Sequence, residues 1–399
     1  MAKITVIVPV YNLYEYIDRC LTSIVNQSFS DLEIVLINDG STDKSAKKCQ
    51  EWATRDDRII FVSKKNEGAG PARNLGIQVA SAEFIAFCDP DDWYDERYIE
   101  IMLNKQQETD ADIVACGRYR YDGTQNKVVG TVIPLAKDVK TDYWSHWEWK
   151  LINALWVKIY RKSLFIDYGI KMPAGHGEDT AIQYFIMTVA NKVAVVEQPL
   201  YYHWFNRAGS SLNSVKAHTS CTVMYLTYGW ELFKRASMFE RYKKPLLLEC
   251  YSIIANWYPK IKDDEVYTKN WLSGCAKAIK TYFDDIHIKD SGESSKRIIG
   301  YGALGQSAAY WLPLLAGSPL SPTDLWDING GTGEVSKPDW TSISGDDCIL
   351  CFPRGDIENE LRLQFEGLNC LVLYSLEIAR WHAYWMIACI LCKRTRNYE

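Results

Sequence analysis

The sequence predicts an α/β fold built on a mostly parallel sheet. Up to about residue 120, short runs rich in β-branched residues alternate with segments of helical spacing, which is the period of βα units. The strand candidates are nearly continuous in apolar residues, as expected for strands covered by helices on both faces. Apolar residues make up 47% of the 399 residues, enough to build more than one core.

Each predicted element follows from its local pattern. The predicted strands are Ile4–Val10, Glu33–Asn38, Ile59–Ser63, Phe84–Cys88 and Ile113–Cys116. The predicted helices are Glu15–Asn26, Asp43–Thr54, Pro71–Ala80 and Asp95–Glu108. Ser41 and Thr42 supply a capping signal before the second helix, and Pro71 suits the first turn of the third.

Charge and composition exclude several classes of protein. The formal net charge is −5, from 45 basic and 50 acidic residues, which argues against binding nucleic acid by bulk electrostatics. No uncharged apolar run approaches the roughly 20 residues that span a bilayer. The first residues lack a signal-peptide pattern and the 12 cysteines are scattered through apolar runs, so we expect a reduced, cytoplasmic protein.

Polar clusters follow three of the predicted strands directly. They are Tyr11–Asn12, Asn38–Ser41 and Asp89–Asp92. Any one of them fits a turn with Asx capping, but together they indicate a ligand site at the carboxyl edge of the sheet. Carboxylates in the third cluster suit Mg²⁺ or Mn²⁺ bridging to phosphates. Arg73, in the glycine-bearing segment Asn66–Asn74, is able to pair with phosphate.

These motifs, in this order, make residues 1 to about 213 resemble family 2 glycosyltransferases. The resemblance is carried by Val8–Asn12, Asn38–Asp43, Asn66–Gly68, Ala72–Asn74, Asp89–Asp92, Leu155–Arg161, Gly177–Asp179 and Tyr201–Trp204. It implies a GT-A fold that binds a nucleotide sugar. It also implies an inverting reaction, in which the acceptor oxygen attacks the anomeric carbon in line with the departing nucleoside diphosphate.

The resemblance further implies a donor site and a metal site. The donor site would comprise Pro9, Tyr11, Asp39, Arg73, Asp89 and Asp92. The metal site, for Mn²⁺ or Mg²⁺, would comprise Asp91, Asp89 and His203, with Asp91 as the main ligand. Pro90 stands where the family often has a small residue, which leaves the division of labour among the three aspartates open. For His203, packing between aromatic residues is the alternative.

Asp179 matches the catalytic base of the family, with Glu178 as its support. A carboxylate is ionised at pH 7 and can take a proton from an acceptor hydroxyl. The alternative is that these acids only complement the dipole at the start of a helix running to about Ala190. Trp156 and Lys158, with Arg161, are expected on the acceptor side, although Trp156 also fits a core position.

The sequence after residue 213 divides into three further regions. Residues 214–292 are helical and rich in aromatic residues, which indicates packing or, alternatively, contact with an acceptor or a membrane. Residues 293–380 resemble a Rossmann-like domain, in which Gly300, Gly302, Gly305 and Asp327 would bind a dinucleotide such as NAD(P). The alternative is a degenerate domain kept for packing or partner contacts.

The last region, residues 381–399, is apolar and then basic, and fits peripheral contact with an anionic membrane surface. Two Cys-Ile-Leu-Cys segments, starting at Cys348 and Cys389, have the local spacing of zinc ligands, but buried packing is the favoured interpretation.

The sequence therefore predicts a glycosyltransferase that moves a sugar from a UDP-sugar to a hydroxyl of a growing surface glycan, such as capsule or O-antigen. The acceptor would be a glycan or a lipid-linked glycan. The alternatives are a non-catalytic nucleotide- or glycan-binding regulator and a transferase fused to an NAD(P)-dependent oxidoreductase.

Overall fold

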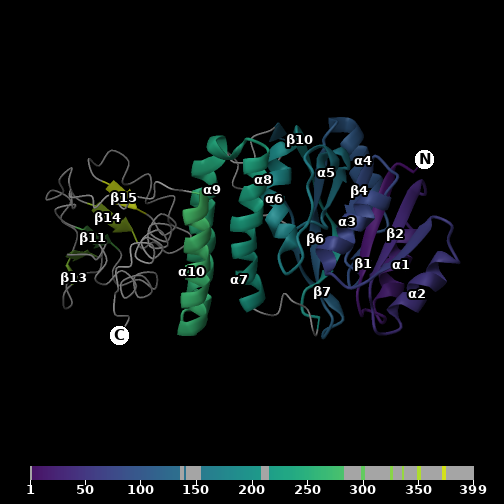
Figure 1. Cartoon of the computed structure of the whole chain (residues 1–399), viewed down its shortest axis with the longest axis horizontal. Coiled ribbons are helices and arrows are strands. Elements are labelled where there is room, and N and C mark those ends of the chain that lie inside the picture. The colour runs from purple at the N-terminus through teal and green to yellow at the C-terminus, as the bar shows by residue number, and fades with distance from the viewer. Residues whose placement is uncertain are drawn as a thin grey trace. The chain divides into compact units, whose positions relative to one another are not determined.

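The computed structural model describes residues 2–134, 139–140, 154–207 and 215–282, together with five short strands between residues 298 and 373 (Figure 1). The chain divides into two units, Met1–Pro245 and Leu246–Glu399. The four-region division expected from the sequence, with boundaries near residues 213, 292 and 380, stays a prediction.

A ten-stranded sheet organises the first unit, with the order β3-β2-β1-β4-β9-β6-β10-β5. Its strands are β1 (Ile4–Val10), β2 (Leu32–Asp39), β3 (Ile59–Lys64), β4 (Phe84–Phe87), β5 (Trp93–Tyr94), β6 (Ile113–Asp122), β9 (Lys158–Arg161) and β10 (Lys192–Trp204). Two more lie off this path: β7 (Lys127–Val132) pairs with β6, and β8 (Val139–Lys140) pairs with β10. The strands from β3 to β4 are parallel to one another, and so are β6 and β10, whereas β9 runs antiparallel to β4 and β6.

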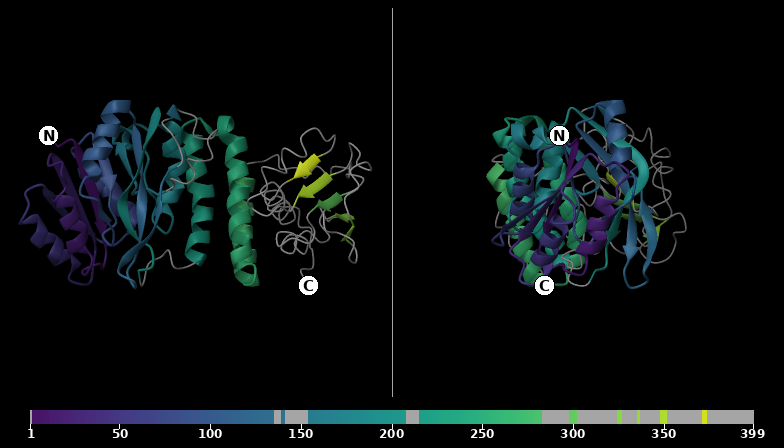
Figure 2. Two further views of the ribbon diagram at one scale, coloured as in Figure 1. Left: turned by 180° about the vertical axis from the view of Figure 1, so that it is seen from behind. Right: turned by 90° about the vertical axis from the view of Figure 1, so that its right-hand side faces the viewer.

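Helices connect and cover these strands. They are α1 (Ile17–Val25), α2 (Ser45–Ala53), α3 (Ala69–Val79), α4 (Tyr98–Thr109), α5 (Ser163–Asp167) and α6 (Glu178–Val189). In the chain, α3 packs on β1 and β2, and α4 packs on β6 and β10. Figure 2 shows the N-terminal βα units, drawn in purple, at one end of this sheet. The predicted α/β fold with a mostly parallel sheet is confirmed, and each predicted strand and helix up to residue 120 is present.

A helical segment closes the first unit. It comprises α7 (Val215–Met224), a π-helical turn η4 (Tyr225–Gly229), α8 (Trp230–Arg235) and the start of α9 (Phe239–Ile261). The side chains of Trp230, Phe233, Phe239 and Tyr242 are all buried. Phe233 stacks edge-on against Phe185 of α6, so these aromatic residues extend the core and the packing interpretation holds for them. Among the described helices, none combines the length and the apolar character needed to cross a bilayer.

The second unit contains the rest of α9, α10 (Glu265–Tyr282) and a five-stranded sheet. The strands are β11 (Ile298–Tyr301), β12 (Asp324–Trp326), β13 (Val335–Ser336), β14 (Cys348–Cys351) and β15 (Leu371–Leu373). All its neighbouring pairs are parallel, in the order β13-β12-β11-β14-β15, which is a strand order of doubly wound sheets. Gly300 lies in β11. Gly302, Gly305, Asp327, the second cysteine pair and residues 381–399 lie outside the described residues, so their predicted roles stay predictions.

Candidate active site

The loops that follow β1, β2 and β4 gather the predicted donor residues at one edge of the sheet. Because these strands are parallel, their carboxyl ends point the same way. Asn12 joins the first two loops: its Oδ1 accepts a hydrogen bond from the backbone N–H of Thr42 (2.8 Å), and its Nδ2 donates to Thr42 Oγ1 (3.2 Å). Pro9 is buried within β1, whereas the ring of Tyr11 is 44% exposed and open to a ligand.

Asp39, at the end of β2, holds the glycine-bearing loop in place. Its carboxylate accepts hydrogen bonds from the backbone N–H groups of Glu67 (3.1 Å) and Gly68 (2.8 Å) and from Lys64 Nζ (2.8 Å). Only 3% of the residue is exposed. Asp39 therefore holds the loop that leads into α3 in place. Its predicted contact with the nucleotide stays a prediction.

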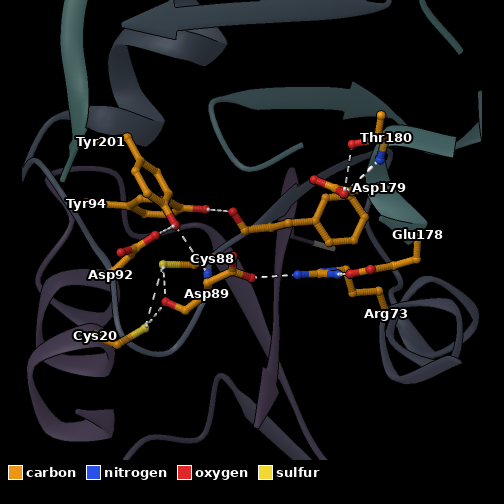
Figure 3. A network of polar contacts seen from close by, with 11 residues as sticks. Cys20, Arg73, Cys88, Asp89, Asp92, Tyr94, Glu178, Asp179, Thr180 and Tyr201 are labelled. Atoms are coloured by element: carbon orange, nitrogen blue, oxygen red, sulfur yellow. Dashed lines mark hydrogen bonds and ion pairs between the residues drawn. The ribbon is translucent and has the colours of Figure 1, made fainter. Parts of the chain in front are cut away.

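Arg73 links the end of β4 to the start of α6 (Figure 3). Its Nη2 donates to Asp89 Oδ1 at 2.7 Å and its Nη1 donates to Glu178 Oε1 at 2.5 Å. Burial by itself lowers the pKa of Arg73, but the charges of Asp89 and Glu178 outweigh it and raise that pKa above its ordinary value. Arg73, which was predicted to lie near a diphosphate, is thus already ion-paired with two carboxylates. It brings two predicted site residues, Asp89 and Glu178, together.

Asp179 lies beside this network in the first turn of α6. Its carboxylate is half-buried, and its Oδ1 accepts a hydrogen bond from the backbone N–H of Thr180 (2.7 Å). Burial and the charge of Glu178 raise the pKa of Asp179 to about 6, although the charge of Arg73 opposes them. The group is therefore ionised at neutral pH and is a stronger base than an ordinary aspartate.

Gly177 fixes the point at which α6 begins. It caps the helix with a φ of +85°, a conformation that strains residues with a Cβ. A Cβ added there would lie 2.5 Å from both Cβ and Sγ of Cys221 in α7. The start of α6, and with it Asp179, is thus seated against α7 by a position that only glycine fills without strain.

We expect Gly177→Ala to destabilise the fold by about 1–3 kcal/mol and to lower activity, because both the backbone conformation and the contact with Cys221 must change. Gly169→Ala is the matched control. Gly169 also has a positive φ (+58°), but an added Cβ would meet nothing within 4 Å among the described residues. Thermal unfolding and turnover of both variants test this. Equal activity in the two variants would contradict the idea that the close packing of Gly177 at the start of α6 matters for activity.

Asp91 and Asp92 have different environments although they are neighbours. Asp92 is 2% exposed, accepts hydrogen bonds from Tyr201 Oη (2.8 Å) and the Trp204 backbone N–H (2.8 Å), and so ties the loop after β4 to β10. Burial and the charges of Asp91 and Asp89 raise the pKa of Asp92 well above its ordinary value. Little of Asp92 is left for the predicted contact with a nucleotide sugar.

The carboxylates of Asp89 and Asp91 fit a hard divalent cation. Their hydrogen bonds use one oxygen each: Oδ1 of Asp89 faces Arg73, and Oδ2 of Asp91 accepts from Arg207 Nε at 2.6 Å. Burial and the charge of Asp89 raise the pKa of Asp91, a repulsion that a cation would relieve. Within the described ranges no three ligand-type side chains gather as a ready metal cage. Two carboxylates completed by water and substrate phosphates are, however, a usual arrangement for Mg²⁺.

The predicted acceptor-side residues and His203 separate into buried and half-buried positions. Lys158 is fully buried, where Nζ donates to the Ala154 carbonyl (2.5 Å) and Gln183 Oε1 (2.9 Å), and burial lowers its pKa to about 7. Lys158 therefore supports α6 through Gln183 rather than facing solvent. Trp156 is 9% exposed and stacks on Tyr201, with the ring of His203 tilted against it at 4.8 Å. Burial and the charge of Arg118 lower the pKa of His203 to about 4, so its imidazole is neutral at pH 7.

Two arginines near this edge were not predicted from the sequence. Arg207 pairs with Asp91, and Arg118 lies over Trp156 with its guanidinium carbon 5.3 Å from the ring centre. Arg207 stands three residues after Trp204, but spacing alone does not tell which acid it meets. Arg118 lies in β6, two residues beyond Cys116, at which the predicted strand ended.

The chain is similar in sequence to several proteins named as glycosyltransferases. Residues 5–172 match the sequence model of glycosyl transferase family 2. Glycosyltransferase GlyA of Streptococcus pneumoniae serotype 4 is 33% identical over 223 residues, which cover 52% of this chain and 31% of GlyA. The minor teichoic acid biosynthesis protein GgaB of Bacillus subtilis is 28% identical over 311 residues, which cover 73% of this chain and 33% of GgaB.

Solved structures agree on the fold. The complex of S. aureus TarS 1–349 with UDP-GlcNAc superimposes with a TM-score of 0.52 at 20% identity, covering 69% of this chain and 81% of that one. At this identity the likeness concerns the fold alone, and it matches the sheet described above. The chain spans only about a third of the length of GlyA and of GgaB.

Proposed function

We propose that this chain, whose residues 5–172 match the model of glycosyl transferase family 2, transfers a sugar from a nucleotide sugar to a hydroxyl group of a glycan. The observation that carries the proposal is the arrangement at the start of α6. There the carboxylate of Asp179 lies beside an arginine that is ion-paired to Asp89 at the end of β4. One base next to one cation-binding acid is what a single displacement at an anomeric carbon needs.

In the proposed reaction Asp179 acts as the general base. The acceptor oxygen forms a bond to the anomeric carbon, and the bond from that carbon to the donor phosphate oxygen breaks, its electron pair leaving with the diphosphate. The proton of the acceptor hydroxyl passes to the Asp179 carboxylate. Arg73 holds Glu178 at 2.5 Å, so Glu178 positions the first turn of α6 rather than competing for that proton. A single displacement inverts the anomeric configuration.

A divalent cation, Mn²⁺ or Mg²⁺, belongs to the proposal. Asp91 and Asp89 would hold it, and when bound it would offset the negative charge on the departing diphosphate. Arg207 keeps Asp91 oriented through the 2.6 Å bond to its Oδ2. His203 faces Trp156, and its neutral imidazole is compatible with the metal role expected from the sequence.

The donor is proposed to be a UDP-sugar and the acceptor a growing surface glycan, free or lipid-linked. The fold-level likeness to TarS in its complex with UDP-GlcNAc supports the first part. The likeness to GgaB, named for minor teichoic acid biosynthesis, supports the second. The exposed ring of Tyr11 and the loop fixed by Asp39 provide the surface on which a nucleotide base would lie.

Thermal unfolding of the full chain with UDP, GDP or CDP, each with and without Mn²⁺, tests this proposal. A ligand at about 100 times its dissociation constant stabilises the native state by about 2.7 kcal/mol. We expect UDP to raise Tm more than GDP or CDP, and Mn²⁺ to enlarge the shift. Asp91→Asn should abolish the Mn²⁺ enhancement. Folded protein whose Tm responds to none of the three nucleotides would contradict the proposal.

A further inference from the structure

Arg118 is a half-buried arginine that forms no ion pair with any described residue. Among the described residues, no acceptor forms a hydrogen bond or ion pair with its guanidinium, and its Nε is fully buried without a partner. The other arginines that are buried or half-buried in the described part of the chain each donate to a carboxylate or a carbonyl; they are Arg19, Arg58, Arg73, Arg161 and Arg207. Arg118 contacts the face of Trp156 instead.

Arg118 shares its surroundings with a second arginine, Arg120. In the parallel ladder of β6 and β10, Arg118 pairs with Tyr201 and Arg120 pairs with His203, so all four side chains leave the same face of the sheet. Trp156 lies against Tyr201 and His203 on that face. Burial and the charge of Arg120 lower the pKa of Arg118, with Asp92 opposing. We call Arg118, Arg120, Trp156 and His203 the Arg118 cluster.

Such a cluster lowers the stability of the fold unless an anion is bound to it. Removing a guanidinium from water without an anionic partner is unfavourable, and a second cation on the same face adds repulsion. An oxyanion between the two arginines would remove both penalties and accept the fork of N–H donors that Arg118 presents. The stacked rings of Trp156 and Tyr201 form an apolar wall that would strengthen such a pairing.

We propose that the Arg118 cluster binds an oxyanion, a phosphate or a carboxylate, carried by the acceptor, so that the acceptor is an anionic glycan. This inference rests on the proposed transferase function. Trp156, on whose ring Arg118 lies, stands two residues before Lys158, and Lys158 donates to Gln183 of α6, the helix whose first turn carries the base. The acceptor hydroxyl must lie at that base. The loops of β1 and β2, which would hold the nucleotide, lie on the other side of β4 in the sheet order.

Binding measurements on the full chain test the assignment. Isothermal titration with glycerol 3-phosphate and with glucuronate, each with and without saturating UDP, compares wild type, Arg118→Gln and Arg55→Gln. Arg55 is a suitable control because it is an exposed arginine that also contacts a ring, that of Trp52, but lies in the segment after α2. We expect wild type and R55Q to bind one of the two oxyanions equally well, R118Q to bind it at least tenfold more weakly, and R118Q to keep its affinity for UDP within about twofold.

Several results would overturn the assignment. Equal oxyanion affinity in R118Q and wild type would exclude Arg118 as an oxyanion ligand. Failure of the wild type to bind either probe would exclude the whole cluster as an oxyanion site. Weaker UDP binding by R118Q, with unchanged oxyanion binding, would mean that Arg118 binds the donor diphosphate instead. Because R118Q loses an unpaired charge, its Tm should equal or exceed that of wild type, and a clearly lower Tm would make the arginine structural.

The two proposals fail separately. If the wild type binds an oxyanion through Arg118 but its Tm does not respond to UDP, the oxyanion site stands and the transferase function is wrong. If UDP binds and no oxyanion does, the transferase function stands and the anionic acceptor is wrong.

Discussion

Asp179→Asn should lower turnover by about 10²- to 10⁴-fold while leaving the affinity for the UDP-sugar nearly unchanged. The amide has the shape of the carboxylate and can keep the hydrogen bond that Oδ1 accepts from the Thr180 N–H, but it cannot take a proton from the acceptor hydroxyl. Turnover with a UDP-sugar donor and titration of the same donor measure the two parts. Asp57→Asn, which changes an exposed aspartate away from this site, is the control.

The pH profile adds a second readout for the same residue. Burial and Glu178 raise the pKa of Asp179 to about 6, so the base becomes protonated and turnover falls as the pH drops below about 6. The charges of Glu178 and Asp89 favour the protonated form, whereas the charge of Arg73 favours the ionised form. We expect the acid limb of the wild-type profile near pH 6, and we expect it to be missing from the residual activity of D179N.

Stability should change in the opposite sense to activity. The folded pKa of Asp179 lies above its ordinary value of 3.8, so the native state binds this proton more tightly than the unfolded state. Its contribution to stability is therefore lost as pH rises from about 4 to 6. At pH 7.5, D179N should unfold at the same or a higher temperature than wild type. Unchanged turnover in D179N would exclude Asp179 as the base. A wild type that binds UDP but transfers no sugar would favour the non-catalytic regulator.

Much of the fold could be predicted because its strands carry their own signal. The runs Ile4–Val10 and Phe84–Phe87 are almost entirely apolar and are buried along their length, and a strand of that kind is recognisable without its neighbours. Strand β9 is different. It begins with Lys158, a charged residue that becomes a core residue only because Gln183 and the Ala154 carbonyl accept its hydrogen bonds. Its antiparallel place between β4 and β6 depends on those long-range contacts, which no local pattern encodes.

The site shows the same division between local and long-range information. The acids Asp89 and Asp179 were predicted because each belongs to a short motif. The pairing of Arg73 with Glu178 joins residues 105 positions apart, and spacing does not carry that information. Arg73 was therefore expected at a diphosphate, although both of its terminal nitrogens are already used by Asp89 and Glu178. That Arg118 has no hydrogen-bond or ion-pair partner among the described residues is likewise a property of the folded chain only.

Arg73→Met should destabilise the fold by about 3–5 kcal/mol, because it leaves the Asp89 and Glu178 carboxylates without their shared cation in a buried setting. Methionine keeps most of the side-chain length, so the effect reports the charge more than the volume. For a unit of this size the loss corresponds to roughly 10 °C in Tm. The exposed ion pair of Arg97 and Glu100 provides the control. Arg97→Met breaks this solvent-exposed pair and should leave Tm nearly unchanged.

Removal of one of the two carboxylate charges separates charge from packing. In the double variant Arg73→Met with Glu178→Gln, only Asp89 is left without the cation, so the Tm deficit should be smaller than that of R73M. A double variant with the full deficit of R73M would mean that Arg73 stabilises the fold by packing alone. It would also mean that the ion pairs do not hold α6 at the end of β4, because the guanidinium that lies 2.7 Å and 2.5 Å from two carboxylates could then be replaced without an electrostatic penalty.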